Sequence, residues 1–408
     1  MVKAHLLVPE GYENTLYNWV LNFQFADVET SKLYKESKVL DEGDIFIFSN
    51  PDLYPAEYPD GLALFDEEHN CACLLGMKYF GEHKKGTLTL AWSIAQRNGY
   101  TACHGGQKRF NLGKGKDKVI GVFGLSGSGK STITLSDHGG KLDTTVLHDD
   151  AFIISNEDAS SISLEPSYFD KTQDYPLTNP QSKMFLTIQN CGATIDEDGK
   201  VVAVTEDIRN GNGRTVKSKF ATPKREYRFA SPCNSIFWIM KDNTLPPVTS
   251  AELGSAMGAT LATKRTTAEY IKGEDPNKLV IVPYANPFRL YPLAVDYMKF
   301  KDLFENQNVE CYIINTGFFL EKKITPKITL GLIEDIVMDR AKFKQFGNFS
   351  TLDYLPIEGF VPDFKDAQYK VMVKDRMQDR LNFVKELDKV DQLPEEALNA
   401  IQKIIDEA

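Results

Sequence analysis

Residues 118–135 read KVIGVFGLSGSGKSTITL, and this stretch decides the fold class. The apolar run KVIGVF is typical of a buried strand, and STITL after the glycines favours the start of a helix. Between them, Gly124–Ser131 fit the pattern G-x-x-x-x-G-K-[ST] of a phosphate-binding loop, in the strand and helix context that the pattern requires. Strand, glycine-rich turn and helix in this order predict an α/β fold with a mononucleotide-binding domain.

Each residue type in this loop suits the binding of phosphate. The glycines let successive backbone N–H groups point at phosphate oxygens without an obstructing Cβ. Lys130 is predicted to reach the β- and γ-phosphates, and the hydroxyl of Ser131 to bind Mg²⁺. The predicted nucleotide-binding residues of the loop are Gly124, Leu125, Ser126, Gly127, Ser128, Gly129, Lys130, Ser131 and Thr132.

Two adjacent carboxylates, Asp149 and Asp150, end the apolar run VLH downstream of this loop. A strand end beside a phosphate-binding loop is where nucleotide-bound metal is held, and neighbouring carboxylates can bind one divalent ion or two. Taken alone, such a pair is more often a turn or a helix N-cap. After a phosphate-binding loop, the sequence favours a metal site.

A third candidate cluster lies upstream of the loop. Lys84 and Lys85 stand in YFGEHKKG, which predicts a glycine-bounded turn, and His104 follows in ACHGG. The lysines would neutralise phosphate, and the histidine would bind a metal or complete a turn. For an isolated histidine or lysine pair a structural role is the commoner one, so this cluster gains meaning only together with the other motifs.

The composition narrows the class of protein. The chain has 408 residues, 42% of them hydrophobic and 25% charged, which indicates a globular protein of two domains or one large one. A net charge of -10 argues against a nucleic-acid-binding surface. Six cysteines are too few for a disulfide framework. With neither an export signal nor a long apolar run, a cytoplasmic protein without a membrane span is expected.

Two domains are predicted: a smaller α+β domain over residues 1–103 and a nucleotide- and metal-binding domain over residues 104–408. The patterns predict strands at residues 44–48, 61–65, 71–81, 279–288 and 309–319, a hairpin at 196–204, and helices at 86–99, 293–307, 328–342 and from 374 onward.

In order and spacing, YFGEHKKG, ACHGGQKRFNLG, VFGLSGSGKST and VLHDDAF resemble the ATP-dependent phosphoenolpyruvate carboxykinase family. NSIFWIMKDNTLPPVTSAEL, ECYIINTGFF and KKITPKITL continue the resemblance, which runs from about residue 75 to about residue 360. It implies a P-loop mononucleotide-binding domain with mixed sheets and a smaller N-terminal domain. It also implies conversion of oxaloacetate and ATP to phosphoenolpyruvate, ADP and CO₂, with Mg²⁺ and Mn²⁺ as cofactors.

The resemblance further implies roles for single residues. Metal ligands would be Lys85, His104 and Asp150 for Mn²⁺, with Ser131 and Asp149 at Mg²⁺. The base and ribose would be contacted by Lys323 and Thr329. The phosphoryl transfer itself would involve Lys84, Lys130, Asp149 and Arg214, in a cleft between the two domains.

The sequence also departs from the family. The family's N-terminal domain is about twice as long and contains a G-R-S-P-K-D-K stretch whose arginine binds the substrate carboxylate. This chain has no arginine before Arg97 and no such stretch. Arg225 and Arg228 are either substitutes for that arginine or surface charges. Lysine does not replace the bidentate guanidinium without loss.

Three functions therefore remain open. The first is phosphoenolpyruvate carboxykinase activity on oxaloacetate. The second is a related kinase with another small-molecule acceptor or a protein side chain, as in the related P-loop of HPr kinase. The third is a non-catalytic ATP sensor. In each case a monomer or small homo-oligomer is expected, with no nucleic-acid or membrane partner.

Overall fold

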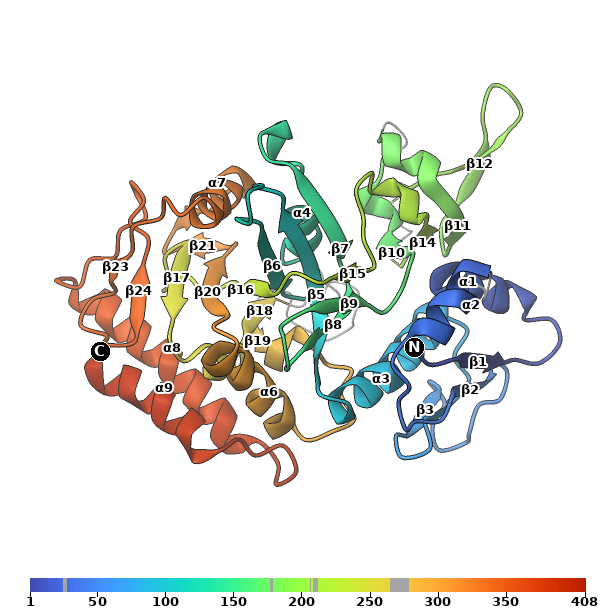
Figure 1. Ribbon diagram of the computed structural model, residues 1–408, viewed down its shortest axis with the longest axis horizontal. Helices are drawn as coiled ribbons and strands as arrows, with labels where there is room; N and C mark the ends of the chain where they lie inside the picture. The colour runs from blue at the N-terminus through green and yellow to red at the C-terminus, as the bar shows by residue number, and fades with distance from the viewer. Residues whose placement is uncertain (25–27, 126, 177–178, 206, 208–211, 265–278) are drawn as a thin grey trace. The chain divides into compact units, whose positions relative to one another are not determined.

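The computed structural model describes residues 1–408 except residues 25–27, 126, 177–178, 206, 208–211 and 265–278 (Figure 1). The chain forms two compact units. Unit 1 comprises Met1–Ile94 and Leu164–Arg225, and unit 2 comprises Ala95–Ser163 and Glu226–Ala408. The sequence placed one boundary between residues 103 and 104, whereas the chain changes unit three times. Sequence patterns are local and carry no sign that a later segment returns to the first unit.

Unit 1 begins with a four-stranded sheet in the order β1-β2-β4-β3, in which only β3 runs antiparallel to its neighbour. Side chains alternate between the faces of a strand, so Ile45, Ile47, Ala72 and Leu74 share the buried face. The elements are β1 (Ala4–Leu7), α1 (Glu13–Phe23), α2 (Val28–Glu36), β2 (Ile45–Asn50), β3 (Leu62–Asp66), β4 (Cys71–Leu75) and α3 (Phe80–Arg97).

The second segment of unit 1 supplies a three-stranded antiparallel sheet, β10-β14-β11, and a separate hairpin, β12-β13. The hairpin predicted at residues 196–204 is confirmed, with Gly199 at φ 76° in its turn. The strands are β10 (Tyr168–Lys171), β11 (Phe185–Gln189), β12 (Ala193–Ile195), β13 (Val201–Ala203) and β14 (Arg214–Lys217).

Helix α3 begins at Phe80, earlier than the predicted start at residue 86. Lys84 and Lys85 therefore lie within a helix and not in the predicted glycine-bounded turn. Of the two flanking glycines, Gly81 is required by packing. A Cβ at Gly81 would lie 2.2 Å from the ring of Tyr79, which excludes any larger residue without a shift of that ring.

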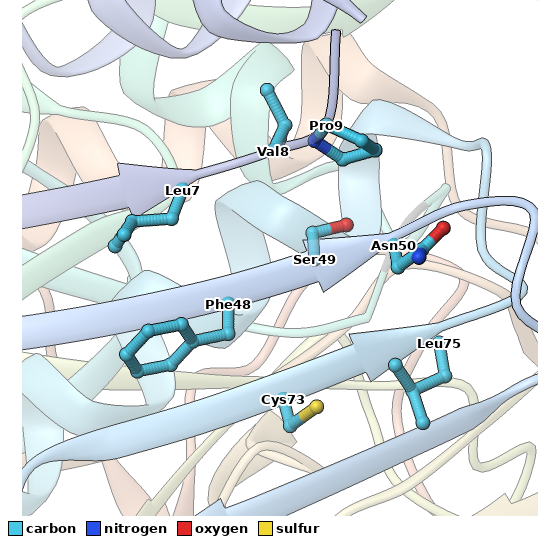
Figure 2. Close-up of a pocket in the computed structure, with 8 residues that line it drawn as sticks. All are labelled: Leu7, Val8, Pro9, Phe48, Ser49, Asn50, Cys73 and Leu75. Carbon is cyan, nitrogen blue, oxygen red and sulfur yellow. The ribbon is translucent and has the colours of Figure 1, made fainter.

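The outward face of the first sheet has a hollow of about 300 Å³ lined by uncharged residues (Figure 2). Phe48 on β2 and Leu7 on β1 are each 46% exposed there. The hollow offers no acid, base or cation to a substrate, so it lacks the charged groups of a catalytic site. Its lining consists of Leu7, Val8, Pro9, Phe48, Ser49, Asn50, Cys73 and Leu75.

Unit 2 is built on a large mixed sheet whose path is β15-β9-β8-β5-β6-β16-β20-β17-β24-β23, with β7 also paired to β5. At its centre, β6, β16 and β20 run parallel. The strands are β5 (Tyr100–Phe110), β6 (Lys118–Phe123), β7 (Thr144–His148), β8 (Ala151–Ser155), β9 (Ser161–Ser163), β15 (Arg228–Phe229), β16 (Cys233–Met240), β17 (Val248–Ala251), β20 (Glu310–Asn315), β23 (Lys344–Gln345) and β24 (Leu352–Tyr354).

Helices cover both faces of this sheet. Alternate residues of β16 divide between two cores: Trp238 packs with α5, α6, α8 and α9, whereas Phe237 and Ile239 pack with α4 and α7. The helices are α4 (Lys130–Leu135), α5 (Gly254–Ala259), α6 (Leu293–Asn306), α7 (Pro326–Val337), α8 (Ala367–Glu386) and α9 (Glu395–Glu407); short pairs are β18 (Ala262–Lys264) with β19 (Leu279–Ile281) and β21 (Phe318–Phe319) with β22 (Lys322–Lys323).

The apolar run at residues 279–288 forms a shorter strand than predicted, because β19 ends at Ile281. A turn follows in which Tyr284 and Ala285 both adopt left-handed φ values, 53° and 55°. Such a backbone cannot continue a strand. No helix among the described residues is long and apolar enough to cross a membrane.

Candidate nucleotide and metal site

The sequence motifs of unit 2 meet at one edge of the central sheet. Because β6, β16 and β20 are parallel, the residues that follow them lie at the same edge. Strand β7 runs antiparallel to β5, as β6 does, so its carboxyl end points the same way. Ligands of open α/β sheets bind at this edge.

The glycine loop, defined as Gly124–Ser131, follows β6 and leads into α4. Gly127 and Gly129 have φ values of 75° and 103°, which an L-residue adopts only under strain. A Cβ at Gly124 would lie 2.3 Å from Oγ of Ser128. Three glycines are therefore required by geometry. Ser126 lies outside the described residues.

Two residues beyond the glycine loop anchor it to neighbouring strands. Oγ1 of Thr316, directly after β20, donates to the carbonyl of Ser128 at 2.8 Å. Nζ of Lys241, directly after β16, donates to the carbonyl of Gly127 at 3.3 Å. The loop thus follows one parallel strand, β6, and is held in place by residues that follow the other two, β16 and β20.

A pocket of about 170 Å³ lies beside the glycine loop. It is smaller than the roughly 300–1,000 Å³ typical of complete ligand sites, so it suits one part of a nucleotide-sized ligand. Its apolar walls match a flat base, and its hydroxyls and one lysine offer polar contacts. The lining consists of Gly127, Ser128, Gly129, Thr132, Ile133, Lys241, Thr316, Ile324, Pro326, Thr329 and Leu330.

The two residues predicted to contact base and ribose differ in position. Thr329, on α7, is buried and lines this pocket. Lys323, on β22, is exposed and does not line it, although its neighbour Ile324 does. Lys241 and Thr316 were missed by the sequence analysis. Their signal was their place directly after two apolar strands.

His104, Asp150 and Lys130 form a contiguous cluster at this edge. Nε2 of His104 lies 3.0 Å from Oδ1 of Asp150, and Nζ of Lys130 lies 3.1 Å from the same oxygen. Strand pairing brings them together, because β5 places His104 beside the end of β6 and opposite Ala151. Lys130 opens α4 on the other side of the glycine loop.

His148 and Asp149, which precede Asp150 in the VLHDD motif, have different surroundings. Nδ1 of His148 accepts from the backbone N–H groups of Asp150 at 3.0 Å and Ala151 at 3.2 Å. This side chain therefore fixes the turn after β7. Asp149 is 4% exposed, and Oδ1 of its carboxylate lies 3.9 Å from Nδ1 of His148.

The donor atoms of this cluster fit a divalent metal ion. Nδ1 of His104 donates to the carbonyl of Ala285, so in the neutral ring Nε2 is a bare lone pair. Nε2 lies 3.0 Å from a carboxylate oxygen of Asp150, a distance at which a protonated ring donates to the carboxylate and a neutral ring shares a metal ion with it. Cis ligands at about 2.1 Å from an octahedral ion would be separated by about 3.0 Å.

The donor set is mixed in kind. No group of three or more His, Cys, Asp and Glu side chains that could hold a metal occurs in the part of the chain that the structure describes. The third ligand implied by the resemblance is a lysine, Lys85. It belongs to unit 1, where Nζ lies 5.8 Å from the ring centroid of Trp92.

The other predicted residues of unit 1 differ in burial. Lys84 is buried, and its Nζ lies 3.0 Å from Oε1 of Glu165 in an ion pair whose side chains are 1% and 0% exposed. Arg214 opens β14, donates to the carbonyl of Gly213 at 2.9 Å and lies over the ring of Tyr79. Its guanidinium forms no ion pair with a described carboxylate.

The two arginines considered as substitutes also differ. Arg225 donates to the backbone carbonyls of Glu165 and Pro166 and stacks on the ring of Tyr168, which ties it to the core of unit 1. Arg228 is exposed on β15. Neither arrangement is typical of a carboxylate-binding site.

Comparison with known proteins agrees with these motifs. A family model described as phosphoenolpyruvate carboxykinase matches residues 48–355. The phosphoenolpyruvate carboxykinase (ATP) of Aeropyrum pernix is 26% identical over 317 residues, covering 70% of this chain and 60% of that protein. The protein of the same name from Bradyrhizobium diazoefficiens is 26% identical over 258 residues, covering 60% and 45%.

A shorter match has a higher identity. The glycosomal phosphoenolpyruvate carboxykinase (ATP) of Trypanosoma brucei brucei is 41% identical over 61 residues, covering 15% of this chain and 12% of that protein. The chain thus spans at most 60% of the length of these curated relatives. Because the family model covers most of the chain, the protein belongs to the ATP-dependent phosphoenolpyruvate carboxykinase family.

Proposed function

We propose that this protein catalyses phosphoryl transfer from ATP of the phosphoenolpyruvate carboxykinase type, dependent on divalent metal ions. One observation supports it above the others: Asp150 lies within hydrogen-bond distance of both Lys130 and His104 beside the glycine loop. A phosphate-binding lysine, a carboxylate and an imidazole at one point suit a nucleotide phosphate and a metal ion together.

In the proposed reaction oxaloacetate loses CO₂, and the enolate oxygen that results forms a bond to the γ-phosphorus of ATP as the bond to ADP breaks. The bound divalent ions would polarise the keto acid and neutralise phosphate charge. Backbone amides of the glycine loop would hold the phosphates, and Lys130 would stabilise the negative charge that develops on the phosphate oxygens during transfer. The pocket beside Thr329 would hold the base.

We further propose that Asp149 and Ser131 hold Mg²⁺, whereas His104 and Asp150 hold Mn²⁺ with Lys85. Lys84 and Arg214 would bind the transferred phosphoryl group and the acceptor, as the family resemblance implies. The side chain of Lys84 is buried and paired with Glu165. This role therefore requires that the positive charge of Lys84 still attract the phosphoryl group in the presence of Glu165.

A kinase acting on another acceptor is the second candidate. It is favoured by the absence of any arginine before Arg97 and by the backbone contacts that occupy Arg225. A carboxylate substrate such as oxaloacetate is best recognised by a free guanidinium. An ATP sensor without turnover is the third candidate.

The test is a coupled assay of the purified full-length chain with ATP, Mg²⁺, Mn²⁺ and oxaloacetate, in which phosphoenolpyruvate is detected directly. We expect phosphoenolpyruvate to form, and Lys130→Met to lower kcat by about 10²- to 10³-fold. ATP consumption only with another acceptor would establish the second candidate, and ATP binding without turnover the third.

A matched pair of histidine variants tests the metal-binding cluster. His104→Gln should raise the Mn²⁺ concentration needed for half-maximal activity by about tenfold or more, because an imidazole ligand is lost. His69→Gln is the control. It removes a histidine whose Nδ1 lies 2.8 Å from an aspartate, Asp66, in an exposed pair, and it should leave the Mn²⁺ requirement unchanged.

A further inference from the structure

A second polar cluster lies in unit 2, on the sheet face that α4 and α7 cover. Lys108, on β5, is fully buried there. Its Nζ donates to the carbonyl of Ile133 at 2.6 Å and of Ser136 at 3.3 Å, both at the carboxyl end of α4. The third ammonium hydrogen meets Nε2 of His138 at 2.7 Å. All three donors of the lysine are therefore used.

The chain of contacts continues to α7. Because the lysine can only donate, Nε2 of His138 accepts and Nδ1 carries the proton. Nδ1 lies 3.1 Å from Oε1 of Glu334, to which it donates. Burial, and after it the charge of Lys108, lowers the pKa of His138. Lysine, histidine and glutamate thus connect α4 with α7.

These two helices form facing walls of the pocket beside the glycine loop. Thr132 and Ile133 come from α4, whereas Thr329 and Leu330 come from α7. Glu334 lies one helical turn beyond Leu330, on the same face of α7. A contact at Glu334 therefore acts on the wall that lines the pocket.

We propose that Lys108, His138 and Glu334 are positioning residues that set the separation of the two walls of the nucleotide pocket, and so the affinity for the nucleotide. The inference rests on the proposed function, because it takes a nucleoside diphosphate with Mg²⁺ as the ligand. It adds residues that touch neither phosphate nor base. Lys108 stands in the segment ACHGGQKRFNLG that carries the family resemblance, whereas His138 and Glu334 stand outside the motifs.

The strength of this link depends on the protonation of the lysine. Burial lowers the pKa of Lys108 to about 7, although the carboxylates of Asp137 and Glu334 act in the opposite direction. The other charged group of the cluster is Lys141, whose Nζ lies 3.6 Å from Glu334. Above this pH the neutral amine has two hydrogens for three acceptors, so one contact is lost.

The test measures the dissociation constant of MgADP by calorimetry, with the full-length chain and with Lys108→Met, at about pH 6 and about pH 8.5. At the lower pH we expect the variant to bind about tenfold more weakly, and at the higher pH within about twofold of the wild type. The ratio of the two constants cancels the titration of the nucleotide and of the metal ligands, which both proteins share.

The control is Lys118→Met. It removes a lysine of β6 whose Nζ lies 3.4 Å from Asp339, just beyond α7, without touching the cluster. The dissociation constant of MgADP for Lys118→Met should stay within about twofold of the wild-type value at both pH values. If Lys108→Met does not fold, Glu334→Gln takes its place, since it keeps the size of the side chain, and it should bind MgADP about threefold more weakly near pH 6.

The outcomes separate the two proposals. A lower melting temperature with an unchanged dissociation constant would make the cluster purely structural and overturn the inference, as would a variant ratio independent of pH. Absence of MgADP binding to the wild-type protein would overturn the proposed function, and this inference with it. Both proposals are supported if the wild type binds MgADP and Lys108→Met binds it more weakly near pH 6 but almost as well near pH 8.5.

Discussion

Units 1 and 2 each contain a lysine paired with a carboxylate at nearly the same distance, but the two pairs differ in how deeply they are buried. Lys84 lies 3.0 Å from Glu165, with side chains 1% and 0% exposed. Lys130 lies 3.1 Å from Asp150, with side chains 9% and 20% exposed. Distance alone therefore does not distinguish an ion pair that stabilises a core from one that a ligand can reach.

The partners of each pair point to the same distinction. In unit 1 the second oxygen of Glu165 accepts from Nδ2 of Asn22 at 2.8 Å, and Nζ of Lys84 lies over the ring of Phe169. In unit 2, Asp150 is shared with an imidazole at the edge of a sheet. The first pair is enclosed by the core, and the second borders a pocket.

The largest effect is expected when the buried pair is broken. Lys84→Met should lower the free energy of unfolding by about 3–5 kcal/mol, because the carboxylate of Glu165 is left buried without its cation. Urea unfolding followed by circular dichroism would measure it.

Replacing both partners provides the control for this loss. Lys84→Met combined with Glu165→Gln should recover at least about half of the lost stability, since no unpaired charge remains. If the single variant lost less than about 1 kcal/mol, the pair would have to be regarded as accessible to solvent, and the contrast between the two units would fail.

An intermediate effect is expected at a buried carboxylate that has no lysine. Asp296, on α6, accepts from the hydroxyl of Tyr291 at 2.9 Å, and its Oδ2 has no hydrogen-bond partner among the described residues. Burial raises its pKa to about 7, although Arg289 and Tyr291 act in the opposite direction. The folded protein thus holds a proton there that the unfolded chain releases near pH 4.

The sign of the pH dependence follows from this shift. The contribution of Asp296 to stability is full below about pH 4 and is lost as the pH rises to about 7. Asp296→Asn cannot titrate, so its stability relative to the wild type should rise over this range by on the order of 3 kcal/mol. Urea unfolding at several pH values tests this. A constant difference between the two proteins would show that the carboxylate titrates normally.

The smallest change in stability is expected at the accessible pair. Lys130→Met should alter the free energy of unfolding by less than about 1 kcal/mol, because Asp150 keeps its contact with His104 and with solvent. The same unfolding measurement applies. A loss as large as that of Lys84→Met would contradict the distinction between the pairs.

Strongly patterned local segments were predicted well from the sequence. The strand before the glycine loop and the helix at residues 293–307 match β6 and α6 closely, because alternation and helical spacing reflect which side chains are buried. The meeting of the glycine loop with the VLHDD motif at one sheet edge agrees with the expectation from the motifs.

Features that depend on distant pairing were not predictable. Nothing near Lys84 reveals that its partner is Glu165, and nothing in the run at residues 279–288 reveals the left-handed turn that meets His104. The start of α3 was misplaced because glycines usually interrupt helices, whereas here Gly81 allows close packing. The roles of the predicted site residues remain predictions that the proposed variants test.

The discontinuity of unit 1 has a consequence for biosynthesis. Glu165, which neutralises Lys84, and the sheet β10-β14-β11 belong to the segment Leu164–Arg225. A ribosome releases the amino-terminal half of this unit long before that segment, and unit 2 starts to emerge in between. A nascent chain halted before Leu164 should therefore be protease-sensitive throughout its first ninety-four residues, Met1–Ile94, however well those residues are eventually packed.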